Sequence, residues 1–235
     1  MTNQSRADTS PATRHTYAVF DARRLVLILA LGASTALTVA LGITDTAGVP
    51  GYATRFLVWN LFLAWMPLVF ALLFGAARRG ATLLLVGVCW LAFLPNAPYL
   101  VTDLIHLSGQ DNLWRHVLQF GFAAWTGTLL GVVSLRIVHV EVERRFGSIA
   151  GWSLVVISTG LCAVGVVIGR FQRWNSWDLV TSPGLVATST FEWVRSPIAN
   201  VPSTGVAVAV ATFFGIAYIT IWALDGLQRK TADQS

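Results

Sequence analysis

Six long apolar stretches follow one another along the chain, separated by shorter polar segments. They cover residues 25–44, 56–75, 81–100, 117–138, 149–169 and 204–224. Each is close to the roughly 20 residues that an α-helix needs to cross the hydrocarbon core of a bilayer. The pattern predicts an all-α, polytopic membrane protein built as a bundle of about six transmembrane helices.

Composition excludes a soluble domain. Hydrophobic residues make up 55% of the 235 residues and charged residues only 11%, against about 25% charged residues in an ordinary soluble domain. Residues 1–24 are polar and are predicted to form a disordered leader, and residues 228–235 a short tail. The first apolar stretch is longer than the 7–15 apolar residues of a usual signal peptide, so we expect an uncleaved anchor and one membrane domain over residues 25–227.

The basic residues are unevenly divided between the two sides of such a bundle. With the N-terminus inside, the inner segments hold Arg6, Arg14, Arg23, Arg24, Arg78, Arg79, Arg136, Arg144, Arg145, Arg229 and Lys230. The outer segments hold Arg55, Arg115, Arg170, Arg173 and Arg195. Because basic residues favour the cytoplasmic side, both termini are expected to be cytoplasmic. The net charge of +5 is then a topology signal, and no nucleic-acid partner is predicted.

The third apolar stretch ends in an unusual way, with the sequence FLPNAPYLVTDLIHL at residues 93–107. Pro98 disfavours helical geometry at the residue before it, so a break or kink is expected near Asn96. Beyond the break, four polar residues recur at i, i+3, i+4 and i+7, which places them on one helical face. They are Tyr99, Thr102, Asp103 and His106.

The fifth stretch ends on the same predicted side with GRFQRWNSWDL, residues 169–179. Arg170, Arg173, Trp174 and Trp177 again follow i, i+3, i+4, i+7 spacing, and Asn175 and Asp178 lie among them. One interpretation is an interfacial cap, with snorkelling arginines and a tryptophan belt. The number of polar residues exceeds what a belt needs, and intramembrane ionisable residues usually mark a functional site.

Further polar residues are predicted at the same outer level, whereas the inner half is expected to be almost purely apolar. Asn60 lies near the outer end of the second span, and a proline-containing segment, residues 180–203, is predicted as a lid. GxxxG pairs at Gly127/Gly131 and Gly165/Gly169 are expected to let spans four and five pack closely. The predicted binding residues are Asn60, Asn96, Tyr99, Thr102, Asp103, His106, Arg170, Arg173, Trp174, Asn175, Trp177 and Asp178.

Asp103 has two competing roles in this prediction. A bare carboxylate near lipid is costly, so an ion pair with Arg170 or Arg173 is expected. Asp103 and His106 are also the candidates for catalysis, as a base and its orienting partner. They could share a metal ion, but no strong ligand motif supports one, and neither a metal nor a cofactor is predicted.

The strings WNLFLAW (residues 59–65), FLPNAPYLVTDLIHL and GRFQRWNSWDL resemble a family of bacterial multi-pass membrane proteins catalogued as domain of unknown function 1361. The resemblance spans roughly residue 55 to the sixth helix. It implies a bacterial plasma-membrane location, with which the fifteen arginines and single lysine agree. It implies no activity and no catalytic residues.

Three classes of function compete on the sequence alone. The first is a protein that binds or handles an anionic small molecule or a lipid headgroup in an outward-facing polar pocket. The second is a membrane-embedded enzyme that acts on a lipid-linked substrate. The third is a structural or assembly subunit whose polar groups pair within the bundle.

Overall fold

The structure, a computed structural model, describes residues 11–43, 52–78, 80–107, 113–174 and 177–232, and every regular element within these ranges is a helix. Six helical segments are long and apolar enough to cross a membrane: Leu25–Ile43, Arg55–Ala76, Gly80–Leu107, Leu113–Phe146, Ser148–Phe171 and Val201–Leu227. The predicted fold class, an all-α bundle with six membrane-spanning helices, is confirmed.

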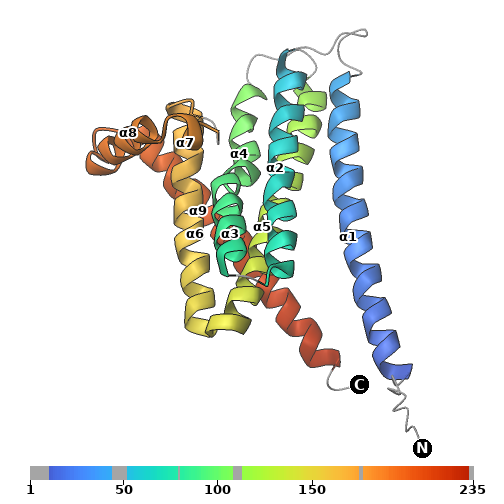
Figure 1. Cartoon of the computed structure of the whole chain (residues 1–235). Helices are drawn as coiled ribbons and strands as arrows, with labels where there is room; N and C mark the ends of the chain where they lie inside the picture. The colour runs from blue at the N-terminus through green and yellow to red at the C-terminus, as the bar shows by residue number, and fades with distance from the viewer. Residues whose placement is uncertain (1–10, 44–51, 79, 108–112, 175–176, 233–235) are drawn as a thin grey trace, which may run out of the picture.

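The spans are arranged around one central helix (Figure 1). The elements in chain order are α1 (Pro11–Ile43), α2 (Tyr52–Ala76), α3 (Gly80–Phe93), α4 (Asn96–Thr102), a 3₁₀ helix η1 (Asp103–Leu107), α5 (Leu113–Phe146), α6 (Ser148–Phe171), α7 (Asp178–Thr181), α8 (Pro183–Arg195) and α9 (Val201–Ala232). Helix α5 packs against α1, α2, α4, α6 and α9. The third span therefore consists of α3, α4 and η1, whereas α7 and α8 connect the fifth span to the sixth.

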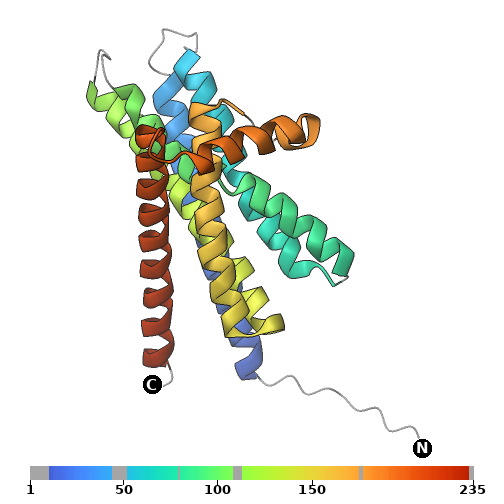
Figure 2. The same ribbon diagram turned by 90° about the vertical axis from the view of Figure 1, so that its left-hand side faces the viewer.

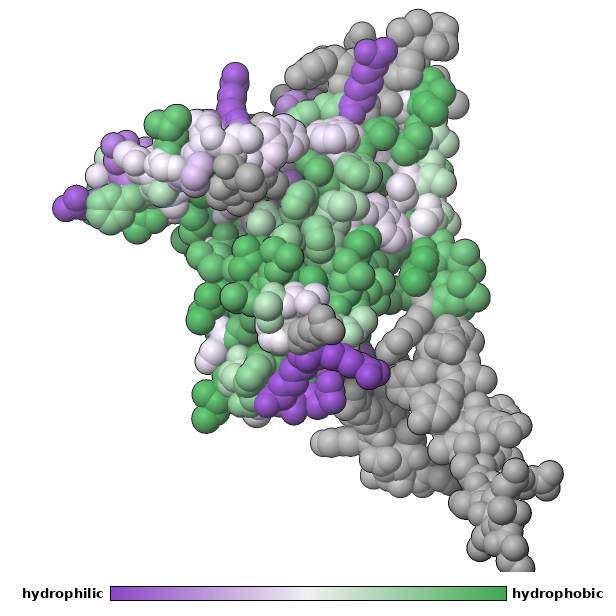
Figure 3. Space-filling model, viewed as in Figure 1, coloured by the Kyte–Doolittle hydropathy of each residue, from purple (hydrophilic) through white to green (hydrophobic). Residues whose placement is uncertain are grey.

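The two ends of the bundle differ. The start of α1 and the end of α9 lie at the same end, here called the terminus end, and α7 and α8 lie at the other, the α8 end (Figures 1 and 2). In Figure 3 the middle of the visible face is apolar, and polar side chains gather at its two ends. This distribution is typical of a bundle that spans a bilayer, with the start of α1 and the end of α9 on the same side.

The side of the membrane on which the termini lie can be tested with single cysteines. In a variant lacking Cys89 and Cys162, Ala199→Cys should react with an impermeant maleimide in intact cells, because residue 199 lies at the α8 end. Phe146→Cys, at the terminus end, should react only after permeabilisation. Labelling of position 146 alone in intact cells would contradict the predicted cytoplasmic termini.

The third span is broken where the two prolines stand, as predicted. Helix α3 ends at Phe93 and α4 begins at Asn96. Pro98 has no amide hydrogen to donate to Leu94 one turn earlier, and the Leu94 carbonyl instead accepts the amide of Ala97 at 3.1 Å. The side chain of Asn96 donates to the carbonyl of Phe93 at 2.9 Å, which supports the turn.

The two glycine pairs pack against the third span, which differs from the prediction that they join spans four and five. A Cβ at Gly127 would lie 2.4 Å from the carbonyl oxygen of Ala97, and a Cβ at Gly165 would lie 2.4 Å from Cγ of Pro95. A Cβ at Gly131 would lie 2.8 Å from the Phe214 ring and 2.9 Å from Cβ of Ala97, and a Cβ at Gly169 would lie 3.3 Å from the Tyr99 ring. Because α4 lies between α5 and α6, these glycines allow its backbone to approach both helices closely.

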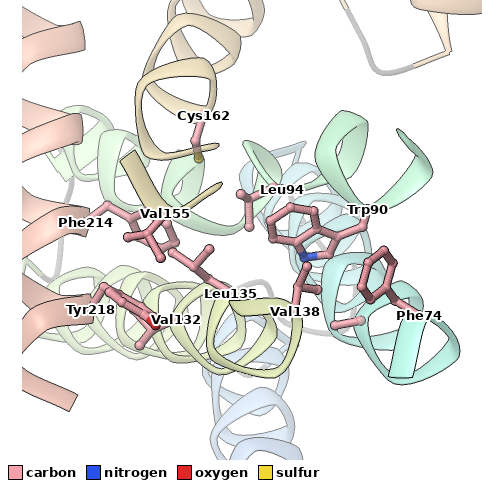
Figure 4. Close-up of a cluster of buried hydrophobic side chains, with 11 residues drawn as sticks. Phe74, Trp90, Leu94, Val132, Leu135, Val138, Val155, Cys162, Phe214 and Tyr218 are labelled. Carbon is pink, nitrogen blue, oxygen red and sulfur yellow. The ribbon is translucent and has the colours of Figure 1, made fainter. Parts of the chain in front are cut away.

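A packed apolar cluster fills the middle of the bundle between α3, α5, α6 and α9 (Figure 4). Trp90, Leu94, Leu135, Phe214 and Tyr218 are all at most 1% exposed. The indole nitrogen of Trp90 donates to Oγ of Ser134 at 3.3 Å, so its one polar atom is satisfied. This cluster packs α3 and α9 against α5 and α6 in the interior of the bundle.

Candidate functional site

The buried carboxylate of Asp103 joins three spans at the α8 end. Its Oδ1 accepts a hydrogen bond from Nη2 of Arg170 at 2.7 Å, and its Oδ2 accepts one from Nδ2 of Asn60 at 3.2 Å. Asp103 is 0% exposed and the side chain of Arg170 is 17% exposed. The expected ion pair is therefore present, and Arg170 is the partner of Asp103.

The guanidinium of Arg170 has further partners on α4. Nε and Nη2 donate to Oγ1 of Thr102 at 3.2 and 2.9 Å, and Thr102 Oγ1 donates to the carbonyl of Tyr99 at 2.6 Å. The guanidinium carbon lies 4.8 Å from the centre of the Tyr99 ring, a cation–π distance. Asn60, Thr102, Asp103 and Arg170 thus form a closed group, here called the ion-pair network.

The geometry around Asp103 is that of a structural group. Each of its oxygens accepts a hydrogen bond from the protein, and no part of it is exposed. His106 Nδ1 lies 3.0 Å from the backbone oxygen of Asp103, and its ring stacks on Phe120 with centroids 6.3 Å apart. A catalytic base must lie within reach of the substrate proton that it abstracts, and a fully buried carboxylate with both oxygens bonded to the protein does not. The arrangement therefore favours a structural role for Asp103 and His106, in which they hold η1 in place.

The second sequence motif does not continue as a helix, which corrects the predicted single face. Helix α6 ends at Phe171, and Arg173 has a left-handed backbone with φ of 61°. The amide of Trp174 bonds back to the carbonyl of Ile168 at 3.3 Å. The chain thus turns after Gln172, so the exposed side chain of Arg173 is removed from the face of Arg170.

The rest of that motif lies around this turn. The Trp177 ring meets Trp59 of α2 edge-on, with centroids 6.3 Å apart. Asp178 begins α7 and is partly buried. Asn175, also predicted as a binding residue, lies outside the described residues. The two sequence motifs therefore contact each other through Arg170. The later residues of the second motif, Trp177 and Asp178, belong to the connection between α6 and α8.

A cavity of about 730 Å³ lies beside the ion-pair network, under α8 and between α2, α3, α4 and α6. It is lined by Phe56, Asn60, Leu63, Val88, Leu91, Ala92, Pro95, Asn96, Tyr99, Leu161, Val164, Gly165, Ile168, Gly169, Trp174, Pro183, Val186, Ala187, Thr190, Phe191 and Val194. We call it the α8 cavity. Its lining is mostly apolar, with polar groups near the junction of α2 and α4. In Figure 2, α8 extends over the space between α3 and α6.

Four of the predicted binding residues line the α8 cavity: Asn60, Asn96, Tyr99 and Trp174. Seven others that the structure describes do not: Thr102, Asp103, His106, Arg170, Arg173, Trp177 and Asp178. Of the ion-pair network, Asn60 belongs to the cavity lining, whereas Thr102, Asp103 and Arg170 lie outside it; the lining also includes Tyr99, whose ring contacts Arg170. The sequence predicted an outward-facing polar pocket, whereas the lining of this cavity is mostly apolar with polar groups at one end.

Sequence reasoning missed the face of α8. The segment 180–203 was predicted only as a lid, yet one side of α8 lines the cavity. Its lining residues follow helical spacing: Pro183, Val186, Ala187, Thr190, Phe191 and Val194. This i, i+3, i+4, i+7 pattern is the signal that identifies the face.

Residues 59–221 match a protein family described as "Protein of unknown function (DUF1361)", and they make up more than half of the 235-residue chain. The protein belongs to the DUF1361 family. The matched segment includes the ion-pair network, α8 and nearly the whole cavity lining. Neither the curated proteins nor the solved structures with which the chain was compared include a match.

This DUF1361 protein also has a polar cluster at the terminus end, where the sequence predicted almost purely apolar residues. His139 is 0% exposed, and its Nδ1 hydrogen-bonds to the Tyr218 hydroxyl. Nε of Arg136 donates to Oδ2 of Asp225 at 3.0 Å, which ties α5 to α9. The spacing of Arg136, His139 and Glu143, at i, i+3 and i+7, could have revealed this face.

Proposed function

We propose that this DUF1361 protein binds a membrane lipid, with the apolar chain of the lipid in the α8 cavity and its polar part at Asn60, Asn96 and Tyr99. The observation that carries the proposal is the cavity itself. Its volume of about 730 Å³ lies within the range of about 300–1,000 Å³ typical of ligand pockets. Its lining joins a long apolar wall to a few polar groups.

The position of the cavity supports access from the bilayer. Its walls come from α2, α3 and α6, which are all candidate membrane spans. Val88 and Leu161 line it and are 58% and 46% exposed, so the wall continues into the lipid-facing surface of the bundle. A lipid acyl chain that enters between α3 and α6 would move from one apolar environment to another. Helix α8 would then cover the end of that acyl chain nearest to the α8 end.

Binding is favoured over transport because the centre of the bundle is packed. Beside the cavity, in the packed interior of the bundle, Trp90, Leu94 and Phe214 are at most 1% exposed. A transporter needs a route that continues to the other side. The charge distribution predicts that the α8 end faces outwards, so the proposed ligand is a lipid of the outer leaflet of a bacterial plasma membrane.

The test is to fill the cavity from two opposite walls. Ala92 of α3 and Val164 of α6 both line it, and Ala92→Trp/Val164→Trp adds two large side chains to the space. The native protein, released from membranes in mild detergent, should retain one lipid molecule in native mass spectrometry. The double variant should lose most of that lipid, because the same volume cannot hold both.

A matched control separates this effect from the general burden of added tryptophans. Leu85 of α3 and Val156 of α6 are 65% and 70% exposed and do not line the cavity. Leu85→Trp/Val156→Trp should retain lipid like the native protein. Equal retention by both double variants, or no retained lipid in the native protein, would refute the proposal.

A further inference from the structure

We infer that the lipid bound in the α8 cavity carries an uncharged, hydrogen-bonding head, such as an alcohol or a sugar, in place of a phosphate or carboxylate. The inference rests on the proposed function and specifies its ligand class. It differs from the anionic ligand that the two arginines of the sequence motifs led us to expect.

The lining residues that the structure describes carry no formal charge. Their polar members are amide, hydroxyl and indole groups: Asn60, Asn96, Tyr99, Trp174 and Thr190. No Arg, Lys, His, Asp or Glu is among the described lining residues. A buried ionic group is stable only when it is paired. A phosphate drawn into this cavity would lose its hydration and gain no cation in return.

The nearest arginine does not supply that cation. Arg170 lies behind the ring of Tyr99 and is paired with the fully buried Asp103 at 2.7 Å. Two of its nitrogens also donate to Thr102. Its positive charge is therefore balanced within the protein. An anion at the cavity end would face the carboxylate of this pair as well as the guanidinium, so the net attraction is small.

The polar end offers one donor and one acceptor that suit a hydroxyl group. The Nδ2 of Asn60 donates to Asp103 at 3.2 Å, which fixes the amide and leaves its carbonyl oxygen as the acceptor. In the part of the chain that the structure describes, the Tyr99 hydroxyl hydrogen-bonds to no other residue, and its side chain lines the cavity. A ligand head with hydroxyl groups supplies the donor that suits Asn60 and the acceptor that suits Tyr99.

Charged side chains lie outside the lining. Arg173, Glu192 and Arg195 are exposed, with both signs present, and none of them lines the cavity. The guanidinium of Arg195 lies 5.0 Å from the ring centre of Phe191, on α8. These residues sit where the chain meets the interface, so they are suited to contacting the membrane surface beyond the bound head.

The experiment compares lipids that share their chains and differ in their heads. The full-length protein in detergent is titrated with dioleoylglycerol, a dioleoyl galactolipid, dioleoyl phosphatidic acid and dioleoyl phosphatidylglycerol, and binding is read by native mass spectrometry. The two uncharged lipids should bind at least about tenfold more tightly than the phosphate lipids, since a buried unpaired charge costs more than a lost hydrogen bond. Dioleoylglycerol and the galactolipid separate the alcohol and sugar sources.

Two variants test the residues named. Tyr99→Phe keeps the ring under Arg170 and should weaken dioleoylglycerol binding about fivefold or more, because one hydrogen bond is lost. Ala187→Lys adds a cation to the lining and should move the preference towards phosphatidic acid. Leu185→Lys, on the same helix but outside the lining, should not.

The outcomes distinguish the two proposals. If the phosphate lipids bind as tightly as the uncharged ones, or if Ala187→Lys and Leu185→Lys behave alike, the neutral-head inference is overturned and lipid binding stands. If no dioleoyl lipid binds and the two tryptophan double variants behave alike, the proposed function itself fails.

Discussion

Asp103→Asn should produce the largest loss of stability of any single substitution considered. Asp103 is 0% exposed and pairs with Arg170 at 2.7 Å, so its removal leaves a partly buried guanidinium without its counter-charge. Breaking one side of a buried ion pair typically costs about 3–5 kcal/mol. Thermal or denaturant unfolding in detergent should therefore show a large destabilisation, and Arg170→Gln should show a similar one.

The double variant Asp103→Asn/Arg170→Gln should recover much of this loss, because neither charge is then stranded. A double-mutant cycle measures the coupling between the two side chains. Arg173→Gln is the matched control, since Arg173 is exposed, and its effect should stay within about 0.5 kcal/mol. A coupling near zero between Asp103 and Arg170 would mean that the third and fifth spans are not joined by this pair.

Gly127→Ala should be the second most damaging change. A Cβ at this position would lie 2.4 Å from the backbone oxygen of Ala97 and 2.7 Å from the Leu100 side chain. Since the closest atom belongs to the backbone, α4 must move away from α5. Overpacking of this kind typically costs about 1–3 kcal/mol. The added methyl should also loosen the ion-pair network, because α4 carries Thr102 and precedes Asp103.

Gly121 provides the control on the same helix. A Cβ there would meet nothing within 4 Å, so Gly121→Ala should leave stability unchanged or raise it by up to about 1 kcal/mol through helix propensity. Unfolding of both variants in one detergent gives the comparison. Equal stability of the two would show that the close approach of α4 to α5 is not tight.

The membrane fold was predictable because the bilayer imposes long apolar helices, and hydropathy alone identifies them. The break at Pro95 and Pro98 was predictable because proline lacks an amide hydrogen. The partner of Asp103 was predictable only as one of two arginines. The choice between Arg170 and Arg173 depends on where α6 ends. That end is marked by a left-handed backbone at Arg173, and no glycine stands at this position to indicate it in the sequence.

The α8 cavity could not be predicted as a volume, because it depends on how α3 and α6 diverge below α8. The lining face of α8 was present in the sequence as a helical repeat from Pro183 to Val194, within a segment interpreted as a lid. The terminus-end pair of His139 and Tyr218 was missed for another reason. Tyr218 lies in a largely apolar stretch of α9, and only the packing of α5 on α9 brings it against His139.

The most direct test of lipid binding is a density map of the native protein in a lipid nanodisc, with a bound antibody fragment to add mass. We expect elongated density between α3 and α6, beneath α8, ending beside Tyr99 and Asn60. The same density should be missing from Ala92→Trp/Val164→Trp and present in Leu85→Trp/Val156→Trp. A cavity closed by direct contact of α3 with α6, or one without lipid density in the native protein, would contradict lipid binding in the α8 cavity.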